Sequence, residues 1–240
     1  MIDSPDELCP GSYVLYLRTF ASDERRSRLE LIGVPNFGAD FYSMLLPEAT
    51  EEEDLVAAVR PVGQLVAVGS PGEDRPHAGA ARMYLPKEDW KRPVSLLMEH
   101  ARLVVIQLGA GPGTVWEVAE AMRLLAPQRL VLLVPPELPD PEYEDARKKV
   151  KRELRGMVSA RSSREGYRTL PKIPSRPKGK PGTITRKIGF VRFSDRWVPH
   201  KEVQDYLYQN PASTYFLALT KGMYPVFKEL EVYERRVASS

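Results

Sequence analysis

Cysteine is almost absent from this sequence, since Cys9 is the single one among 240 residues. One cysteine forms no internal disulfide, and it argues against a metal site built on cysteine ligands. The three histidines, His77, His100 and His200, are far apart along the chain, without an HExxH or Cys–His spacing. We therefore expect no metal and no tightly bound cofactor, and the cysteine content suits the reducing cytoplasm.

Long hydrophobic runs and an excess of one charge are also missing. No apolar stretch reaches the roughly 18–20 residues that span a bilayer, and the polar, acidic start of the chain is unlike a secretory signal. The 35 basic and 32 acidic side chains give a net charge of +3. We expect a soluble, cytoplasmic protein without a transmembrane segment, and we do not expect nucleic acid as a partner.

Short apolar runs alternate with helical patterns in the first half of the chain. The runs predict strands over residues 13–20, 64–69, 103–108 and 130–134. Amphipathic spacing predicts helices after Thr50, over 90–101 and over 115–125. Alternating strands and helices predict an α/β fold with three layers around a mostly parallel, flavodoxin-like sheet.

The pattern divides the chain into three parts. Residues 12–155 form the α/β domain, which ends in a charged helix over 142–155. Residues 156–187 are basic and rich in proline, and we interpret them as a linker or long surface loop. Residues 188–240 predict a β-hairpin and a C-terminal helix, kinked at Pro225, that pack on the main domain as an appendage.

The basic stretch from 161 to 187 could bind nucleic acid or an acidic membrane. Tyr167 is its sole aromatic residue, and no folded nucleic-acid motif accompanies it. We therefore favour a solvated linker.

A glycine-rich turn is the most suggestive segment. Residues 109–117, GAGPGTVWE, leave the third predicted strand and enter a helix. Ligands bind at the carboxyl ends of parallel strands, where glycines allow close approach and helix N–H groups attract anions. Glu117 would face this crevice. Two interpretations are equally open: a catalytic carboxylate, or a capping box with Thr114 like the one predicted over 50–53.

Two further stretches lie at the same predicted edge. Arg18 and Phe20 follow the first strand and could hold a phosphate and stack a base, although a surface arginine and a core phenylalanine are slightly favoured. The long loop over 70–86 carries Arg82 and Tyr84. This loop suits a lid or contact segment, or simply a set of solvated charges.

The order of these motifs resembles TIR domains over residues 12–136. The segment YVLYLRTFASD, ending in Asp23, is similar to their first strand and loop, and residues 70–86 occupy the place of their BB loop. Trp116-Glu117 matches the neighbourhood of the catalytic glutamate in enzymatic TIR domains. The GT-x-x-E segment ending at Glu117 is also similar to nucleoside 2-deoxyribosyltransferases, a related fold in which this glutamate is the nucleophile.

Other features qualify the resemblance. The segment GAARMYLPKEDW resembles uncharacterised bacterial proteins that often carry membrane helices upstream. The turn before Glu117 is richer in glycine than a usual TIR turn, and Gly109 and Ala110 stand where a Ser or Asp is usual.

The resemblance implies hydrolysis of the N-glycosidic bond of NAD or a related nucleotide, with Glu117 as the catalytic residue and NAD as substrate. The residues of the predicted crevice would bind this substrate: Arg18, Phe20, Asp23, Arg82, Tyr84, Gly111, Gly113, Thr114 and Trp116. Many TIR domains are assembly modules. Two alternatives therefore stay open, a non-catalytic signalling module that self-associates through the 70–86 loop and a nucleotide sensor without turnover.

Overall fold

The structure, a computed structural model, describes residues 2, 4–18, 50–69, 80–85, 88–161, 170–179, 185–207 and 211–239. The strands are β1 (Tyr13–Leu17), β2 (Gln64–Gly69), β3 (Ala81–Tyr84), β4 (Leu103–Gln107), β5 (Leu130–Val134), β6 (Thr185–Ser194) and β7 (Val198–Leu207). The α-helices are α3 (Glu51–Val59), α4 (Lys91–His100), α5 (Pro112–Leu124), α6 (Asp140–Arg161) and α7 (Pro211–Ala238). Short 3-10 turns cover Pro5–Glu7, Pro127–Arg129 and Asp195–Trp197.

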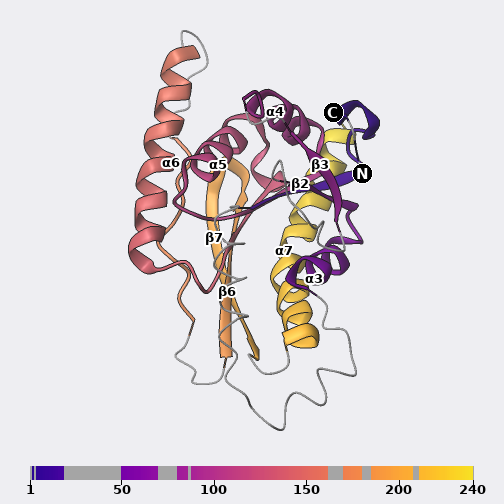
Figure 1. Cartoon of the computed structure of the whole chain (residues 1–240), viewed down its shortest axis with the longest axis vertical. Coiled ribbons are helices and arrows are strands. Elements are labelled where there is room, and N and C mark those ends of the chain that lie inside the picture. Colours follow the sequence, from indigo (N-terminus) through magenta and orange to yellow (C-terminus); the bar gives the residue numbers. More distant parts are fainter. Residues whose placement is uncertain are drawn as a thin grey trace.

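All seven strands form one sheet in the order β3-β2-β1-β4-β5-β6-β7. The first five strands of this order run parallel, whereas β6 is antiparallel to β5 and β7 is antiparallel to β6. The predicted three-layer, mostly parallel α/β fold is therefore confirmed. The C-terminal hairpin extends the sheet beyond β5 (Figure 1).

Side-chain alternation along the buried strands builds a core on each face of the sheet. In β1, Tyr13, Leu15 and Leu17 belong to the core under α4, α5 and α6, whereas Val14 and Tyr16 belong to the core under α3 and α7. Every residue of β1, β4 and β5 is buried. Because such strands are apolar on both faces, they appear in the sequence as continuous apolar runs, and these runs predict strands.

Helix α7 lies close to the sheet because a glycine faces β6. A Cβ atom built on Gly222 would lie 2.2 Å from the ring of Phe190. At its far end, α7 is held by Arg102, whose guanidinium donates to Glu234 at 2.6 and 2.8 Å and to the carbonyl of Val62 at 2.8 Å. Helix α7 thus covers this face of the sheet together with α3.

Residues 81–84 correct the sequence prediction, because they form strand β3 where a long loop over 70–86 was predicted. The polar Arg82 concealed this strand. Its side chain is buried, and its Nη2 donates to both carboxylate oxygens of Glu52 at 2.8 Å. A buried charge is tolerated when it pairs with an opposite charge. Here that partner is distant in the sequence, so the strand was not predicted.

Several elements are longer than predicted. Helix α6 continues to Arg161, helix α7 spans Pro211–Ala238 with Pro225 inside it, and the hairpin strands pair over ten residues each. Part of the segment interpreted as a linker or loop is packed on the domain. Ile173 is buried, its carbonyl accepts from Arg147 at 3.0 Å, and the next carbonyl accepts from Tyr143 at 3.0 Å.

The two outer strands of the sheet differ from its centre. Strand β7 carries the exposed side chains of Pro199, Lys201 and Asp205 along the rim of the sheet. At the opposite rim, Ile2 bridges to Met83 of β3, and its backbone N–H donates to the carbonyl of residue 82 at 2.9 Å. Within the described residues, no helix has the length and apolarity to cross a membrane.

Candidate active site

The strand order reverses beside β1, since β2 and β3 lie on one side of it and β4 and β5 on the other. In open α/β sheets, ligands bind outside the carboxyl ends of the strands at such a reversal. Arg18 directly follows β1, and the turn into α5 follows β4. The first candidate site therefore lies between these two segments.

The capping interpretation of Glu117 is wrong. Helix α5 begins at Pro112 with Gly111 as its N-cap, and no side chain caps it. Thr114 therefore already lies within the first turn, and Glu117 lies in the second. The capping box predicted at the start of α3 is confirmed, because Thr50 Oγ1 accepts from the N–H of Glu53 at 3.2 Å and the Glu53 carboxylate accepts from Thr50 at 2.7 Å.

The Glu117 carboxyl group is buried without compensation. The residue is 8% exposed, and its Oε2 atom has no hydrogen-bond partner within the described residues. Burial raises its pKa from the ordinary value of 4.5 to about 8. A carboxyl group whose pKa lies this close to neutral pH can change its ionisation when a charged ligand binds. This property is typical of catalytic acids and bases.

A second buried glutamate on the same helix shows what a structural carboxylate looks like in this protein. Glu120 accepts from Ser95 Oγ at 2.8 Å, and the guanidinium of Arg123 donates to both of its oxygens at 2.6 and 2.7 Å. Helix α5 thus carries two buried carboxyl groups three residues apart. One is held by hydrogen bonds and an ion pair, whereas the Oε2 atom of the other, Glu117, has no hydrogen-bond partner within the described residues.

The described residues leave space one turn before Glu117. A Cβ atom built on Gly113 would meet none of their atoms within 4 Å. Because residues four apart lie above one another on a helix, this space lies on the same side of α5 as Glu117. The glycine thus leaves the backbone accessible at the helix end that faces the strand reversal.

Arg18 and Arg82, the two predicted phosphate-binding residues, are brought together by Glu52, which the sequence analysis missed. Arg18 lies 3.4 Å from the Glu52 carboxylate, and Arg82 makes the bidentate pair described above. All three side chains are buried. The cluster thus places two guanidinium groups around one buried carboxylate.

A polar pair lies on the same side of the sheet, next to the reversal. The hydroxyl of Tyr16 donates to Oε1 of Gln107, the last residue of β4, at 3.0 Å. Both side chains are buried. Tyr84, the half-buried last residue of β3, ends its strand at the same edge.

The candidate residues occupy two faces of the sheet. Glu52, the centre of the arginine cluster, lies on α3, which packs on one face of the sheet. The apolar side of α5 packs in the core on the other face. A ligand that touches both Glu117 and the arginine cluster therefore has to lie across the strand ends.

Trp116 lies beside this site but its ring is already engaged. Its ring packs edge-on against Trp90, with centroids 4.9 Å apart and planes 83° apart. The ammonium group of Lys91 lies 5.3 Å from the Trp116 ring centroid. Of the other predicted residues, Phe20, Asp23 and most of the 70–86 loop lie outside the described residues.

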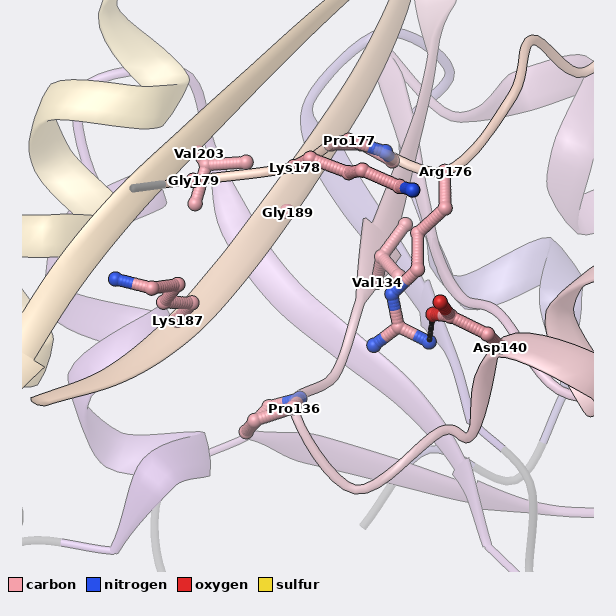
Figure 2. Close-up of a pocket in the computed structure, with 10 residues that line it drawn as sticks. All are labelled: Val134, Pro136, Asp140, Arg176, Pro177, Lys178, Gly179, Lys187, Gly189 and Val203. Carbon is pink, nitrogen blue, oxygen red and sulfur yellow. Dashed lines mark ion pairs between the residues drawn. The ribbon is translucent and has the colours of Figure 1, made fainter. Parts of the chain in front are cut away.

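A pocket of about 420 Å³ lies elsewhere, at the carboxyl end of β5 (Figure 2). It is lined by Val134, Pro136, Asp140, Arg176, Pro177, Lys178, Gly179, Lys187, Gly189 and Val203. Arg176 faces Asp140 at 3.2 Å and also donates to the backbone carbonyl of Leu138, and Lys187 pairs with Asp205 at 2.6 Å. Ion pairs within the protein thus neutralise most of the charge around this pocket. We interpret the pocket as space left where the 170–179 segment packs on the sheet.

The missed residues left only faint signals in the sequence. Glu52 stands among the acids of a helix start, where carboxylates are favourable without any tertiary partner.

No group of three or more potential metal ligands occurs in the part of the chain that the structure describes. No family model, no curated protein and no solved structure matches this chain.

Proposed function

We propose that the protein hydrolyses the N-glycosidic bond of NAD or a related nucleotide, with Glu117 as the catalytic carboxyl group. The observation that carries this proposal is the contrast on α5, where Glu117 is buried without a hydrogen bond to its Oε2 atom and Glu120 is fully bound. The resemblance to TIR domains supports the same assignment. The place of Glu117 after β4, beside the strand reversal, is where this fold class binds nucleotides.

In the proposed reaction, the bond between ribose C1′ and the nicotinamide nitrogen breaks, and its electron pair leaves with the nicotinamide. The ribosyl group that remains has oxocarbenium character, which the ionised Glu117 carboxylate stabilises or attacks. Water then adds to C1′ and a proton is released. The products are nicotinamide and ADP-ribose.

The raised pKa of Glu117 has a role in this scheme. At pH 7 a group with a pKa of about 8 is mostly neutral, so its burial is tolerated in the free protein. The positively charged nicotinamide ring of NAD would favour the ionised form when it binds. We expect the rate at low substrate concentration to rise with pH up to about 8, because it depends on the carboxylate of the free protein.

The arginine cluster and the aromatic residues complete the proposed site. Arg18 and Arg82 would attract the pyrophosphate, because guanidinium groups bind phosphate oxygens through charge-assisted hydrogen bonds. Tyr84, at the end of β3, is a candidate surface for a base. Trp116 is a weaker candidate, since Trp90 and Lys91 already contact its ring.

The test is incubation of concentrated protein with NAD, followed by chromatography for nicotinamide. We expect release by the wild type and by Glu120→Gln, and at least a 100-fold loss in Glu117→Gln, the range associated with a catalytic acid or base. Glu120→Gln is the matched control, since it changes an equally buried carboxyl group on the same helix. Equal release by wild type and Glu117→Gln would contradict the proposed mechanism.

Failure to release nicotinamide would turn attention to the alternatives. A thermal shift with nucleotide but no product would indicate a sensor. Self-association through the 70–86 loop would appear in light scattering as a mass that falls when the loop charges are changed. The assembly alternative interpreted Glu117 as a helix cap, but this residue does not cap α5.

A further inference from the structure

The small net charge of the protein conceals a strong separation of charge along the chain. Residues 147–187 contain 15 basic and 2 acidic residues, so the rest of the chain contains 20 basic and 30 acidic ones. The second half of α6 is the helical part of this basic stretch. On this helix, the regular spacing fixes the relative positions of the side chains.

Four cations form one face of α6. Lys148, Lys151, Arg152 and Arg155 are all exposed, and their spacing of three, four and seven residues places them on the same side of the helix. None of the four has an ion pair among the described residues. We call these four residues the basic face of α6.

The first half of the helix uses the same spacing differently. There, Arg147 pairs with Glu144 and Lys149 pairs with Asp145 at 2.7 Å. Within the basic face, the residues three or four apart are all cations, and like charges at this spacing destabilise a helix. The acids one turn before Lys148, Glu144 and Asp145, are paired with Arg147 and Lys149. A helix that served only to cover the sheet would gain by replacing some of these cations with acids, so the repulsion itself points to an anionic partner.

The helix dipole does not account for the basic face. Cations are favourable within the last turn of a helix, whereas Lys148 and Lys151 lie in the middle of α6, which continues to Arg161. Insertion into a membrane does not account for it either. The apolar side of α6, with Tyr143, Val150 and Leu154, is buried in the protein core, so none of it is available for insertion into lipid.

The shape of the region suits an elongated polyanion. Helix α6 runs along one side of the molecule, and its C-terminal end projects beyond α4 and α5 (Figure 1). From Lys148 to Arg155 the helix rises by about 10 Å, which is the axial distance of about three phosphates on one strand of a DNA duplex.

We propose that the basic face of α6 binds the phosphate backbone of a nucleic-acid duplex without reading its sequence. This surface is separate from the Glu117 site and does not depend on the proposed activity. The proposal replaces the expectation that nucleic acid is no partner. That expectation considered the stretch after residue 160, whereas the basic face lies on helix α6, before that stretch.

The test is fluorescence anisotropy of the full chain with a labelled 20-base-pair DNA duplex at several salt concentrations. The test variant combines Lys148→Gln, Lys151→Gln, Arg152→Gln and Arg155→Gln. The matched control combines Arg60→Gln, Arg92→Gln, Lys221→Gln and Lys228→Gln, which removes the same charge from exposed positions on other helices and helix ends. Both variants should fold, because all eight side chains are exposed.

We expect the wild type and the control to bind the duplex, and the α6 variant to bind at least about 10-fold more weakly at low salt. The slope of log affinity against log salt should flatten by up to about 3.6, or about 0.9 for each lost phosphate contact. Equal losses in both variants would overturn the proposal, because binding would then reflect net charge alone. No binding of the duplex, or binding only to vesicles containing phosphatidylserine, would also overturn it.

Discussion

Glu117 and Glu120 show how much the surroundings of one side chain decide its chemistry. Both are buried on α5, but the Glu120 carboxylate accepts hydrogen bonds from Ser95 and Arg123. Burial raises the pKa of Glu117, so its neutral form is favoured. A residue whose burial destabilises its charged form is a liability for folding, and this liability can be measured without any substrate.

Replacing Glu117 with glutamine is expected to make stability depend less on pH. The folded pKa, about 8, lies above the ordinary value of 4.5. The stability that comes from the neutral carboxyl group is therefore fully present below pH 4.5 and is lost as pH rises through about 8. For the wild type this loss is roughly 3 kcal/mol between pH 5 and pH 7.5, and glutamine removes it.

Urea unfolding of both proteins at the two pH values measures this effect. Asp54, whose pKa burial and the neighbouring Glu51 and Glu53 raise to about 6, changes stability in the same direction. Its contribution is common to both proteins and cancels in their difference. Parallel pH profiles for wild type and Glu117→Gln would show that the Glu117 carboxyl group is not held neutral.

Two glycines within helices predict opposite effects of alanine. In α7, a Cβ at Gly222 would lie 2.2–2.5 Å from ring atoms of Phe190, so Gly222→Ala has to push the helix away from β6. We expect it to destabilise the fold by about 2–3 kcal/mol, as overpacking does. In α6, a Cβ at Gly156 would meet nothing within 4 Å, so Gly156→Ala should stabilise by up to about 1 kcal/mol.

Denaturant unfolding of the two variants tests this pair. Gly156→Ala controls for the helix propensity of alanine, which favours both substitutions. A Gly222→Ala variant that is as stable as the wild type would mean that α7 does not lie against Phe190 as closely as described.

The elements that the sequence predicts well are those whose partners are close in sequence or uniformly apolar. Strands β2 and β5 match their predicted bounds because each is a short apolar run between turn residues. Strand β3 was missed because Arg82 breaks the run, and its partner Glu52 is 30 residues away. Thr114 suggested a cap, but Pro112 suits the first helical position, and α5 starts there, three residues earlier than predicted.

The site shows the same limit at the scale of the whole molecule. The sequence could predict that Arg18 and Glu117 lie at one edge of the sheet, because parallel strands direct their carboxyl ends the same way. It could not predict that Arg18 and Arg82 meet at Glu52, because no local pattern links these three residues. It also could not show that the two groups lie on opposite faces of the sheet.

Removal of α7 should unfold the whole protein rather than one part of it. This helix contributes Tyr215, Leu219, Met223, Val226 and Leu230 to the core shared with the central strands. A chain that ends at residue 207 would expose that core, so we expect loss of cooperative unfolding and binding of a hydrophobic dye. A truncated chain with a sharp unfolding transition would show instead that the C-terminal helix is a dispensable cover.

The rims of the sheet limit how copies of the protein can associate. Backbone groups on an open outer strand can accept a strand from another molecule, which leads to edge-to-edge polymers. Strand β7 meets this hazard with the exposed charges of Lys201 and Asp205, and with Pro199, which has no N–H to donate. Strand β3 is short, and Ile2 occupies part of its rim. Any ordered assembly of this protein is therefore expected to grow through its helices or loops, and not by extension of its sheet.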